Sequence, residues 1–159
     1  GGDVNGDSRD DIVIGARFGA GATNTQANLG EVYVIMGKAS WAGTATLLVS
    51  SAEVTVYGNR DGEEFGAAVG VGNVNGDAYG DLMCSNGKGY TFSTGIVPPE
   101  DVFVLFGRAS WGSTLQVASL NGGTDGFRVA GIDRDDGFGS ALASGDINGD
   151  GVGDIVIGA

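Results

Sequence analysis

Short apolar runs, three to six residues long, recur along the chain between turns rich in glycine, aspartate and asparagine. Several alternate with polar residues or carry β-branched and aromatic side chains, which is typical of strands. No window keeps the i, i+3, i+4 spacing of a helix, apart from a weak possibility at 38–41 and 108–111. We therefore predict an all-β protein with strands at Ile12–Ile14, Glu31–Met36, Val54–Tyr57, Ala67–Val71, Asp81–Cys84, Asp101–Phe106 and Gly126–Ala130.

The chain repeats itself with a period of about 70 residues. Gly37-Lys-Ala-Ser-Trp41 matches Gly107-Arg-Ala-Ser-Trp111 at an offset of 70, and Phe65-Gly66 then matches Phe138-Gly139 at an offset of 73. Four short strands in each repeat suit a β-propeller blade, a four-stranded antiparallel sheet that packs on neighbouring blades. A β-sandwich is the alternative, although it would not require a metal loop at the same point of every repeat.

The same oxygen-rich loop recurs in each repeat. Oxygen-bearing side chains fall at loop positions 1, 3, 5 and 9, and glycines between them let the backbone fold around one point. Calcium prefers six to eight oxygen ligands, so this spacing predicts a calcium site, which a main-chain carbonyl at position 7 and water would complete. The side-chain ligands are Asp3, Asn5, Asp7 and Asp11 in loop 1 (residues 3–11), Asn73, Asn75, Asp77 and Asp81 in loop 2 (73–81), and Asp146, Asn148, Asp150 and Asp154 in loop 3 (146–154).

Composition narrows the possible functions. The 159 residues carry a formal charge of −12, which argues against nucleic acid or an anionic membrane surface as a partner. No apolar run is long enough to insert into a membrane. The chain has no histidine, which removes His-based acid–base catalysis and His-ligated zinc. The single cysteine, Cys84, lies in an apolar strand, where we expect a small core residue.

The repeated loops and the motifs around them resemble the FG-GAP repeats of the integrin α-subunit propeller and its bacterial relatives. The cues are Phe65-Gly66 and Phe138-Gly139, then the Asp-x-Asn-Gly-Asp loops, then Ile-Gly-Ala at 14–16 and 157–159. The resemblance implies a seven-bladed ring in which each metal loop joins the first two strands of a blade. It also implies main-chain ligands at position 7, which are Arg9, Tyr79 and Val152. The usual proline after Gly-Ala is Arg17 here, and Asn73 replaces the first aspartate of loop 2.

In that register the chain divides into a partial blade at 1–58, a complete blade at 59–131 and the start of a third at 132–159. We expect a fragment of a longer protein, or a chain that closes its ring by association with further blades. Loop 2 carries one carboxylate fewer than the other two loops, and we predict that it is the weakest calcium site.

The sequence disfavours three other interpretations of the loops. An EF-hand or dockerin loop needs an acidic residue at position 12, where this chain has Ile14, Cys84 and Ile157. A catalytic carboxylate pair would not be expected to recur in every repeat, so recurrence favours a structural role. Turns without an ion would leave three carboxylates repelling one another at close range.

Several residues outside the loops are further candidates. We expect Trp41, Trp111, Phe65 and Phe138 to pack between blades, with sugar stacking as the alternative for the tryptophans. The acidic clusters at 61–64 and 133–136 are predicted to be solvated turns on the face opposite the metals, or else a rim for a basic partner or a cation. The long loops 17–29 and 86–100 offer Phe18, Tyr90 and Phe92 for ligand binding.

The leading hypothesis is a non-catalytic, calcium-stabilised propeller module that binds a protein or glycan outside the cell, with adhesion as the broad process implied by the resemblance. The ligand is expected on the face opposite the metal loops, and millimolar extracellular calcium would keep even weak sites filled. The alternatives are the propeller portion of a secreted hydrolase or polysaccharide lyase, with its active site outside this segment, and a purely architectural spacer.

Overall fold

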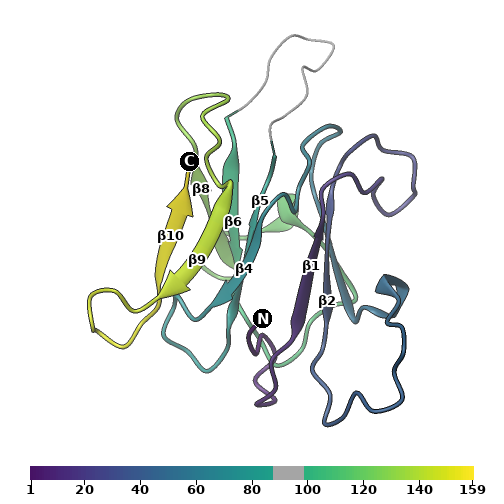
Figure 1. Cartoon of the computed structure of the whole chain (residues 1–159). Helices are drawn as coiled ribbons and strands as arrows, with labels where there is room; N and C mark the ends of the chain where they lie inside the picture. The colour runs from purple at the N-terminus through teal and green to yellow at the C-terminus, as the bar shows by residue number, and fades with distance from the viewer. Residues whose placement is uncertain (88–98) are drawn as a thin grey trace.

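The computed structural model describes residues 1–87 and 99–159, and in this part of the chain it confirms the all-β prediction (Figure 1). Ten strands and two 3-10 turns follow one another: β1 (Ile12–Ala16), β2 (Glu31–Ile35), η1 (Val49–Ser51), β3 (Val54–Tyr57), β4 (Val69–Gly72), β5 (Asp81–Ser85), β6 (Asp101–Leu105), β7 (Thr114–Gln116), η2 (Val117–Ser119), β8 (Gly126–Ala130), β9 (Ala141–Gly145) and β10 (Asp154–Gly158). The weak helix prediction at 38–41 and 108–111 is wrong, because both segments are irregular.

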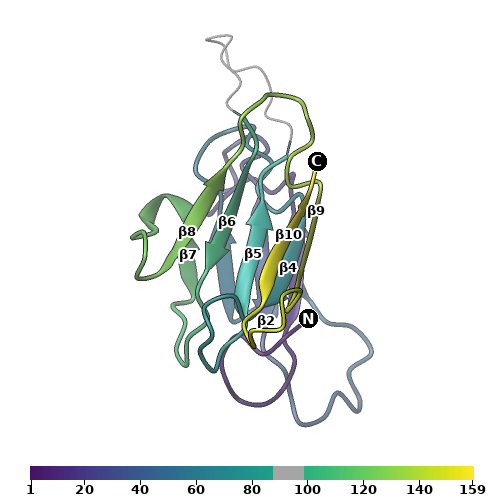
Figure 2. The ribbon, with the colours of Figure 1, turned by 90° about the vertical axis from the view of Figure 1, so that its left-hand side faces the viewer.

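The strands form three sheets that we call blades 1, 2 and 3. Blade 2 is a four-stranded antiparallel meander in the order β4-β5-β6-β8, and blade 3 consists of the hairpin β9-β10. Blade 1 contains β1, β2 and β3 in antiparallel order, and β7 is added to its outer edge in parallel. Figure 2 shows blade 3 lying over β4 at the inner edge of blade 2. This arrangement is that of stacked propeller blades.

The core fills the space between blades 1 and 2. Alternate side chains of a strand point to the same face of a sheet, and the inward positions here are all apolar. Blade 1 contributes Val32, Val34, Val54 and Val56, and blade 2 contributes Leu82, Cys84, Phe103 and Leu105. The opposite face of blade 2 also buries Met83, Val102 and Val104 completely. Strands β5 and β6 are therefore continuous buried runs, because both faces of blade 2 are covered.

Phe65 packs between blades 1 and 2, as predicted, whereas the same packing role for Phe138 stays a prediction. Phe65 is fully buried, and its ring meets Phe103 edge to face at 5.8 Å between centroids. Gly66 and Gly139 have left-handed φ values of 82° and 79°, and their N–H groups donate to the carbonyls of Ser85 and Gly158 at 2.8 Å. A side chain on Gly66 would meet the Glu31 carbonyl at 2.7 Å, so this position requires glycine.

The two ends of the blades carry different kinds of loop. In Figure 1 loops 1, 2 and 3 lie together at the lower end, whereas segments 17–29, 58–66 and 131–139 lie at the upper end. The predicted separation of the metal loops from the acidic clusters at 61–64 and 133–136 is thus confirmed. Among the described residues no helix has the length and apolar character needed to cross a membrane.

Candidate metal centre

Each loop adopts a turn that its own sequence specifies. Loop 2 joins β4 to β5 and loop 3 joins β9 to β10, as predicted for the first two strands of a blade, while loop 1 leads into β1. The glycine at position 4 is left-handed in all three, with φ of 76° at Gly6, 76° at Gly76 and 78° at Gly149. A side chain is disfavoured in this conformation, which explains why the position is glycine in each loop.

The aspartate at position 1 is the centre of loops 1 and 3. In loop 1, Asp3 Oδ1 accepts the N–H groups of Gly6 at 2.6 Å and Asp7 at 3.1 Å, and Oδ2 accepts that of Ser8 at 2.7 Å. In loop 3, Asp146 accepts the three equivalent N–H groups at 2.7, 3.1 and 2.9 Å. These donors stabilise the carboxylate, and they hold the pKa of Asp146 below its ordinary value.

Positions 3 and 5 each fold back onto the backbone two residues later. The side-chain oxygen at position 3 accepts the N–H of position 5, and the carboxylate at position 5 accepts the N–H of position 7. The three loops share this pattern, with Asn5 and Asp7 in loop 1, Asn75 and Asp77 in loop 2, and Asn148 and Asp150 in loop 3. The loops are therefore wound before any ion is considered.

Loop 2 departs from the other two at its first position. Asn73 Oδ1 accepts the Gly76 N–H at 2.8 Å, but its amide nitrogen can only donate, and it bonds the Asp77 carbonyl instead. The backbone conformation at position 6 differs in the same way. Ser8 and Gly151 are left-handed, with φ of 66° and 89°, whereas Ala78 is not. One substitution thus removes both a negative charge and the hydrogen bond that fixes position 6.

The aspartate at position 9 has a structural role that the sequence analysis missed. Asp11 accepts the N–H of Val4 at 2.8 Å on one oxygen and that of Gly37 at 2.7 Å on the other. Asp81 does the same with Val74 and Gly107 at 2.7 and 2.9 Å. Each carboxylate therefore holds its loop against the residues that follow the blade's third strand. The Gly-x-Ala-Ser-Trp motif, which begins with Gly37 and Gly107, is the sequence feature that could have indicated this contact.

These clamping carboxylates are almost completely buried. Burial raises the pKa of Asp11 and of Asp81, and the backbone N–H groups that they accept oppose this rise. The negative charges of Asp3 and Asp7 raise the pKa of Asp11 further, and that of Asp77 acts likewise on Asp81. The carboxylates of one loop are therefore close enough to repel one another, which a bound cation would relieve.

Consecutive loops are tied together by one repeated backbone hydrogen bond. The N–H of Gly80, at position 8 of loop 2, donates to the Asp3 carbonyl at position 1 of loop 1, at 2.7 Å. Gly153 in loop 3 donates to the Asn73 carbonyl of loop 2 at the same distance. A side chain on Gly153 would meet that carbonyl at 2.6 Å, so the close approach depends on glycine.

The donor chemistry of the loops fits calcium. Every side chain at positions 1, 3, 5 and 9 presents oxygen, and each oxygen that accepts an N–H keeps a further lone pair. In the described residues, however, no three acidic, cysteine or histidine side chains converge on a common point that would hold an ion. The carboxylates turn towards backbone N–H groups instead. The predicted ligand set therefore stays a prediction.

The predictions for the aromatic and acidic residues outside the loops are partly confirmed and partly wrong. Trp111 Nε1 donates to the Val4 carbonyl of loop 1 at 3.0 Å and packs against the core, so its expected packing role is confirmed. The solvated-turn prediction is wrong for Glu63 and Glu64, which are buried, because Glu63 accepts the N–H groups of Asn59 and Arg60. It holds for the second cluster, at 133–136, whose residues are all exposed.

Of the predicted ligand-binding aromatics, only Phe18 lies in the described part. Its side chain is 57% exposed at the end opposite the metal loops, and the Arg17 guanidinium stacks 4.4 Å from the ring centroid. Tyr90 and Phe92 lie outside the described residues.

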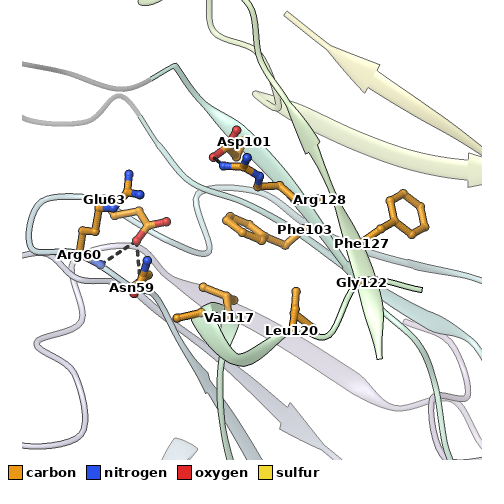
Figure 3. Close-up of a pocket in the computed structure, with 11 residues that line it drawn as sticks. Asn59, Arg60, Glu63, Asp101, Phe103, Val117, Leu120, Gly122, Phe127 and Arg128 are labelled. Carbon is orange, nitrogen blue, oxygen red and sulfur yellow. Dashed lines mark hydrogen bonds and ion pairs between the residues drawn. The ribbon is translucent and has the colours of Figure 1, made fainter. Parts of the chain in front are cut away.

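A cavity of about 280 Å³ between blades 1 and 2 was not foreseen from the sequence (Figure 3). Phe103, Val117 and Leu120 form its apolar wall. The acidic groups are already engaged, since Asp101 pairs with Arg128 at 3.0 Å and Glu63 accepts backbone N–H groups. Its residues come from segments far apart in the sequence, so no local motif indicates it.

Stacked blades with an oxygen-rich loop between their first two strands define a repeat protein of the propeller type. The FG-GAP repeat family model matches residues 1–35 and 138–159, at the two ends of the chain. These two segments are similar to FG-GAP repeats, as the resemblance predicted, whereas the integrin-like type stays a prediction. A comparison with curated proteins gives no match.

Proposed function

We propose that this chain is a calcium-stabilised, non-catalytic propeller module that binds a protein or glycan outside the cell. The observation that carries the proposal is the threefold recurrence of one loop, with its left-handed glycine and its oxygen-bearing side chains at positions 1, 3, 5 and 9, directly ahead of β1, β5 and β10. FG-GAP repeats typically occur in extracellular proteins, which supports the proposed location and a role in adhesion.

Calcium would be held by three sets of residues. The side chains at positions 1, 3, 5 and 9 would supply most ligands, with the main-chain carbonyls of Arg9, Tyr79 and Val152 at position 7. A bound cation would neutralise the loop carboxylates and add its binding free energy to that of folding. The loop residues themselves keep the turn wound and fix the ends of two strands. Because loops 1 and 3 have three aspartates each and loop 2 has two, we expect loop 2 to bind most weakly.

The binding surface for the macromolecular partner is proposed at the end opposite the metal loops. Phe18 is an exposed aromatic side chain there, and the Arg17 guanidinium lies against its ring. A flat aromatic face beside a guanidinium suits either the face of a sugar ring or an acidic peptide. The metal loops would then serve the scaffold and leave this end free for recognition.

Calorimetric titration with calcium, together with melting curves in calcium and in chelator, tests the metal proposal. We expect saturable calcium binding and a melting temperature that falls by several degrees in chelator. Asp150→Ala should abolish one binding event. Asp133→Ala removes an exposed aspartate outside the loops and is the matched control. Equal calcium binding by both variants, or a melting curve indifferent to chelator, would refute the calcium site.

The recognition surface needs a separate test. Labelled protein would be applied to an array of immobilised glycans and extracellular matrix proteins, with Phe18→Ala as the variant and Leu48→Ala as the control for loss of an exposed apolar side chain. Selective loss of capture with Phe18→Ala supports the proposed face. Capture that is unchanged by this substitution places recognition elsewhere, without bearing on calcium.

A further inference from the structure

Strand β7 belongs to the repeat of blade 2 but pairs with blade 1. It lies in the connection between β6 and β8, and it runs parallel to β3 with Thr55, Val56 and Tyr57 opposite Thr114, Leu115 and Gln116. The Thr55 N–H also donates to the Ser113 carbonyl at 2.9 Å. Blade 2 thus covers the outer edge of its neighbour by adding one short strand to it.

Apolar contacts anchor this added strand. Turn η2 follows β7 directly, and its Val117 is only 3% exposed. Leu115 and Leu120 pack on the same core between the blades. The Trp111 indole and the Arg108 N–H, both just ahead of β7, donate to the Val4 carbonyl of loop 1 at 3.0 and 3.1 Å. The connection from 108 to 120 is therefore a docking segment that holds two blades together.

Blade 1 contains the same segment. Thr46-Leu-Leu-Val-Ser-Ser51 matches Thr114-Leu-Gln-Val-Ala-Ser119, and η1 occupies the place of η2. Ser51 Oγ donates to the Leu48 carbonyl at 2.7 Å, as Ser119 Oγ does to that of Gln116, also at 2.7 Å. The residue before each turn has an extended backbone, with φ and ψ of −90° and 136° at Leu48 and −114° and 128° at Gln116. The two segments are the same local structure.

Their exposure is opposite. Val49 is 44% exposed, whereas Val117, its counterpart, is 3% exposed. Leu48 is 64% exposed beside it. Val49 is thus a large apolar side chain exposed in a turn with a preset shape, although its counterpart is buried against the neighbouring blade in the next repeat. With the exposed Leu48 next to it, it indicates a surface that has a partner.

We propose that Thr46–Ser51 is a blade-docking segment that adds a parallel strand to the outer edge of the fourth strand of a preceding FG-GAP blade. Strand β8 shows what such an edge looks like. It is the outermost strand of blade 2 and pairs with β6 on its inner side, whereas on its outer edge, among the described residues, it has only an isolated bridge between Gly122 and Gly126. Aligned at the repeat offset, its Arg128, Val129 and Ala130 take the places of the three β3 residues that β7 covers.

The partner is a preceding blade of the same ring and not a second copy of this chain. If Thr46–Leu48 of a second copy paired with β8, blade 1 of that copy would lie next to blade 2 of the first. Its β1, the second strand of a blade, would then occupy the place beside β4 where β10 already pairs with β9. A preceding blade meets no such obstacle. Its fourth strand would receive Thr46–Leu48, and its metal loop would lie where Trp41 can reach it, as Trp111 reaches loop 1.

The test joins two chains in register. One polypeptide contains residues 1–145 as its first unit, followed directly by residues 3–159 as its second unit. Asp3 of the second unit takes the place of Asp146. Blade 2 of the first unit, which ends in β8, therefore directly precedes blade 1 of the second unit. Ala130→Cys is made in the first unit and Leu48→Cys in the second. These two positions correspond to Tyr57 and Gln116, which lie opposite each other in the pairing of β3 with β7. Tyr57→Cys with Gln116→Cys in the 159-residue chain calibrates the crosslink, and Ala130→Cys with Thr44→Cys is the out-of-register control.

We expect the new pair to form a disulfide at the rate of the calibrating pair, and the out-of-register pair at least tenfold more slowly. In addition, Val49→Ser in the second unit should lower the melting temperature of the tandem protein while leaving that of the 159-residue chain unchanged. A new pair that crosslinks no faster than the out-of-register pair, or a tandem protein insensitive to Val49→Ser, overturns the proposal. Neither readout requires calcium, so the outcome is independent of the proposed metal sites.

Discussion

The indole nitrogen of Trp111 donates a 3.0 Å hydrogen bond to the main-chain carbonyl of Val4, 107 residues earlier in the chain. Val4 is fully buried at position 2 of loop 1, so this bond connects the segment after β6 of blade 2 to loop 1 of blade 1. Loop 1 is therefore part of the contact between blades 1 and 2.

Replacing this tryptophan tests how much the contact contributes. Trp111→Phe keeps an aromatic ring but loses the N–H donor, and we expect the free energy of unfolding to fall by about 1–2 kcal/mol. Urea denaturation measures the change. Trp41→Phe is the control, since within the described residues Trp41 makes no side-chain hydrogen bond and only receives Lys38 over its ring at 5.2 Å. Equal losses in the two variants would contradict a special role for the Val4 bond.

Gly80 provides a test of the bond between loops 1 and 2. A Cβ at this position would lie 2.8 Å from Val71 Cγ1 and 3.0 Å from the Asp3 carbonyl, so Gly80→Ala must push the two loops apart. We expect a destabilisation of about 1–3 kcal/mol. Gly145→Ala is the matched control because nothing lies within 4 Å of its added Cβ. Thermal unfolding that is the same for both variants would show that the close approach is unimportant.

Two substitutions would give loop 2 the features of loops 1 and 3. Asn73→Asp restores the missing carboxylate, and Ala78→Gly allows the left-handed turn that Ser8 and Gly151 adopt at position 6. If the loops bind calcium, the double variant should bind it roughly tenfold more tightly at this site, because ligand charge strongly affects affinity. Calorimetry distinguishes this result from a general effect, since loops 1 and 3 should keep their affinities.

Tyr33 predicts a loss of stability at high pH. Burial, followed by the hydrogen bond to the Glu31 carboxylate and its charge, raises the pKa of Tyr33 from 10.0 to about 12. The folded protein therefore holds this proton more tightly than the unfolded chain. The resulting stabilisation is complete below pH 10 and is lost as the pH rises towards 12. Tyr33→Phe and Glu31→Gln should each flatten the decline in urea midpoint across this window, and a slope unchanged in both would contradict the assignment.

Cys84 should be chemically silent in the folded protein. The thiol is fully buried between the blades, and burial raises its pKa, which keeps it protonated and unreactive. We expect a thiol reagent to label it only at the rate of unfolding, with fast labelling in urea. Rapid labelling in native buffer would show that the core between blades 1 and 2 opens locally.

The sequence predicted the strands well because each blade is specified locally. The runs before and after each loop, the Phe-Gly pairs and the loops themselves recur at fixed offsets, and all of them fold as hairpins of consecutive segments. Strand β7 was missed because Thr114-Leu-Gln has no distinct alternation and its partner, β3, is remote in sequence. The burial of Glu63 and Glu64 was missed because their charge predicts exposure, whereas the surrounding backbone N–H groups satisfy Glu63 internally.

The pairing of β3 with β7 also has a consequence for biosynthesis. The edge of blade 1 stays open until the chain as far as Gln116 has been made, roughly 60 residues after β3 is complete. At about 5–20 residues per second this delay lasts roughly 3–12 s. During that interval the nascent chain presents an unpaired strand edge, which is the kind of surface that chaperones shield and that misassembles when two ribosomes on one message lie close together. The order of synthesis therefore requires each blade to wait for its successor before its edge is closed.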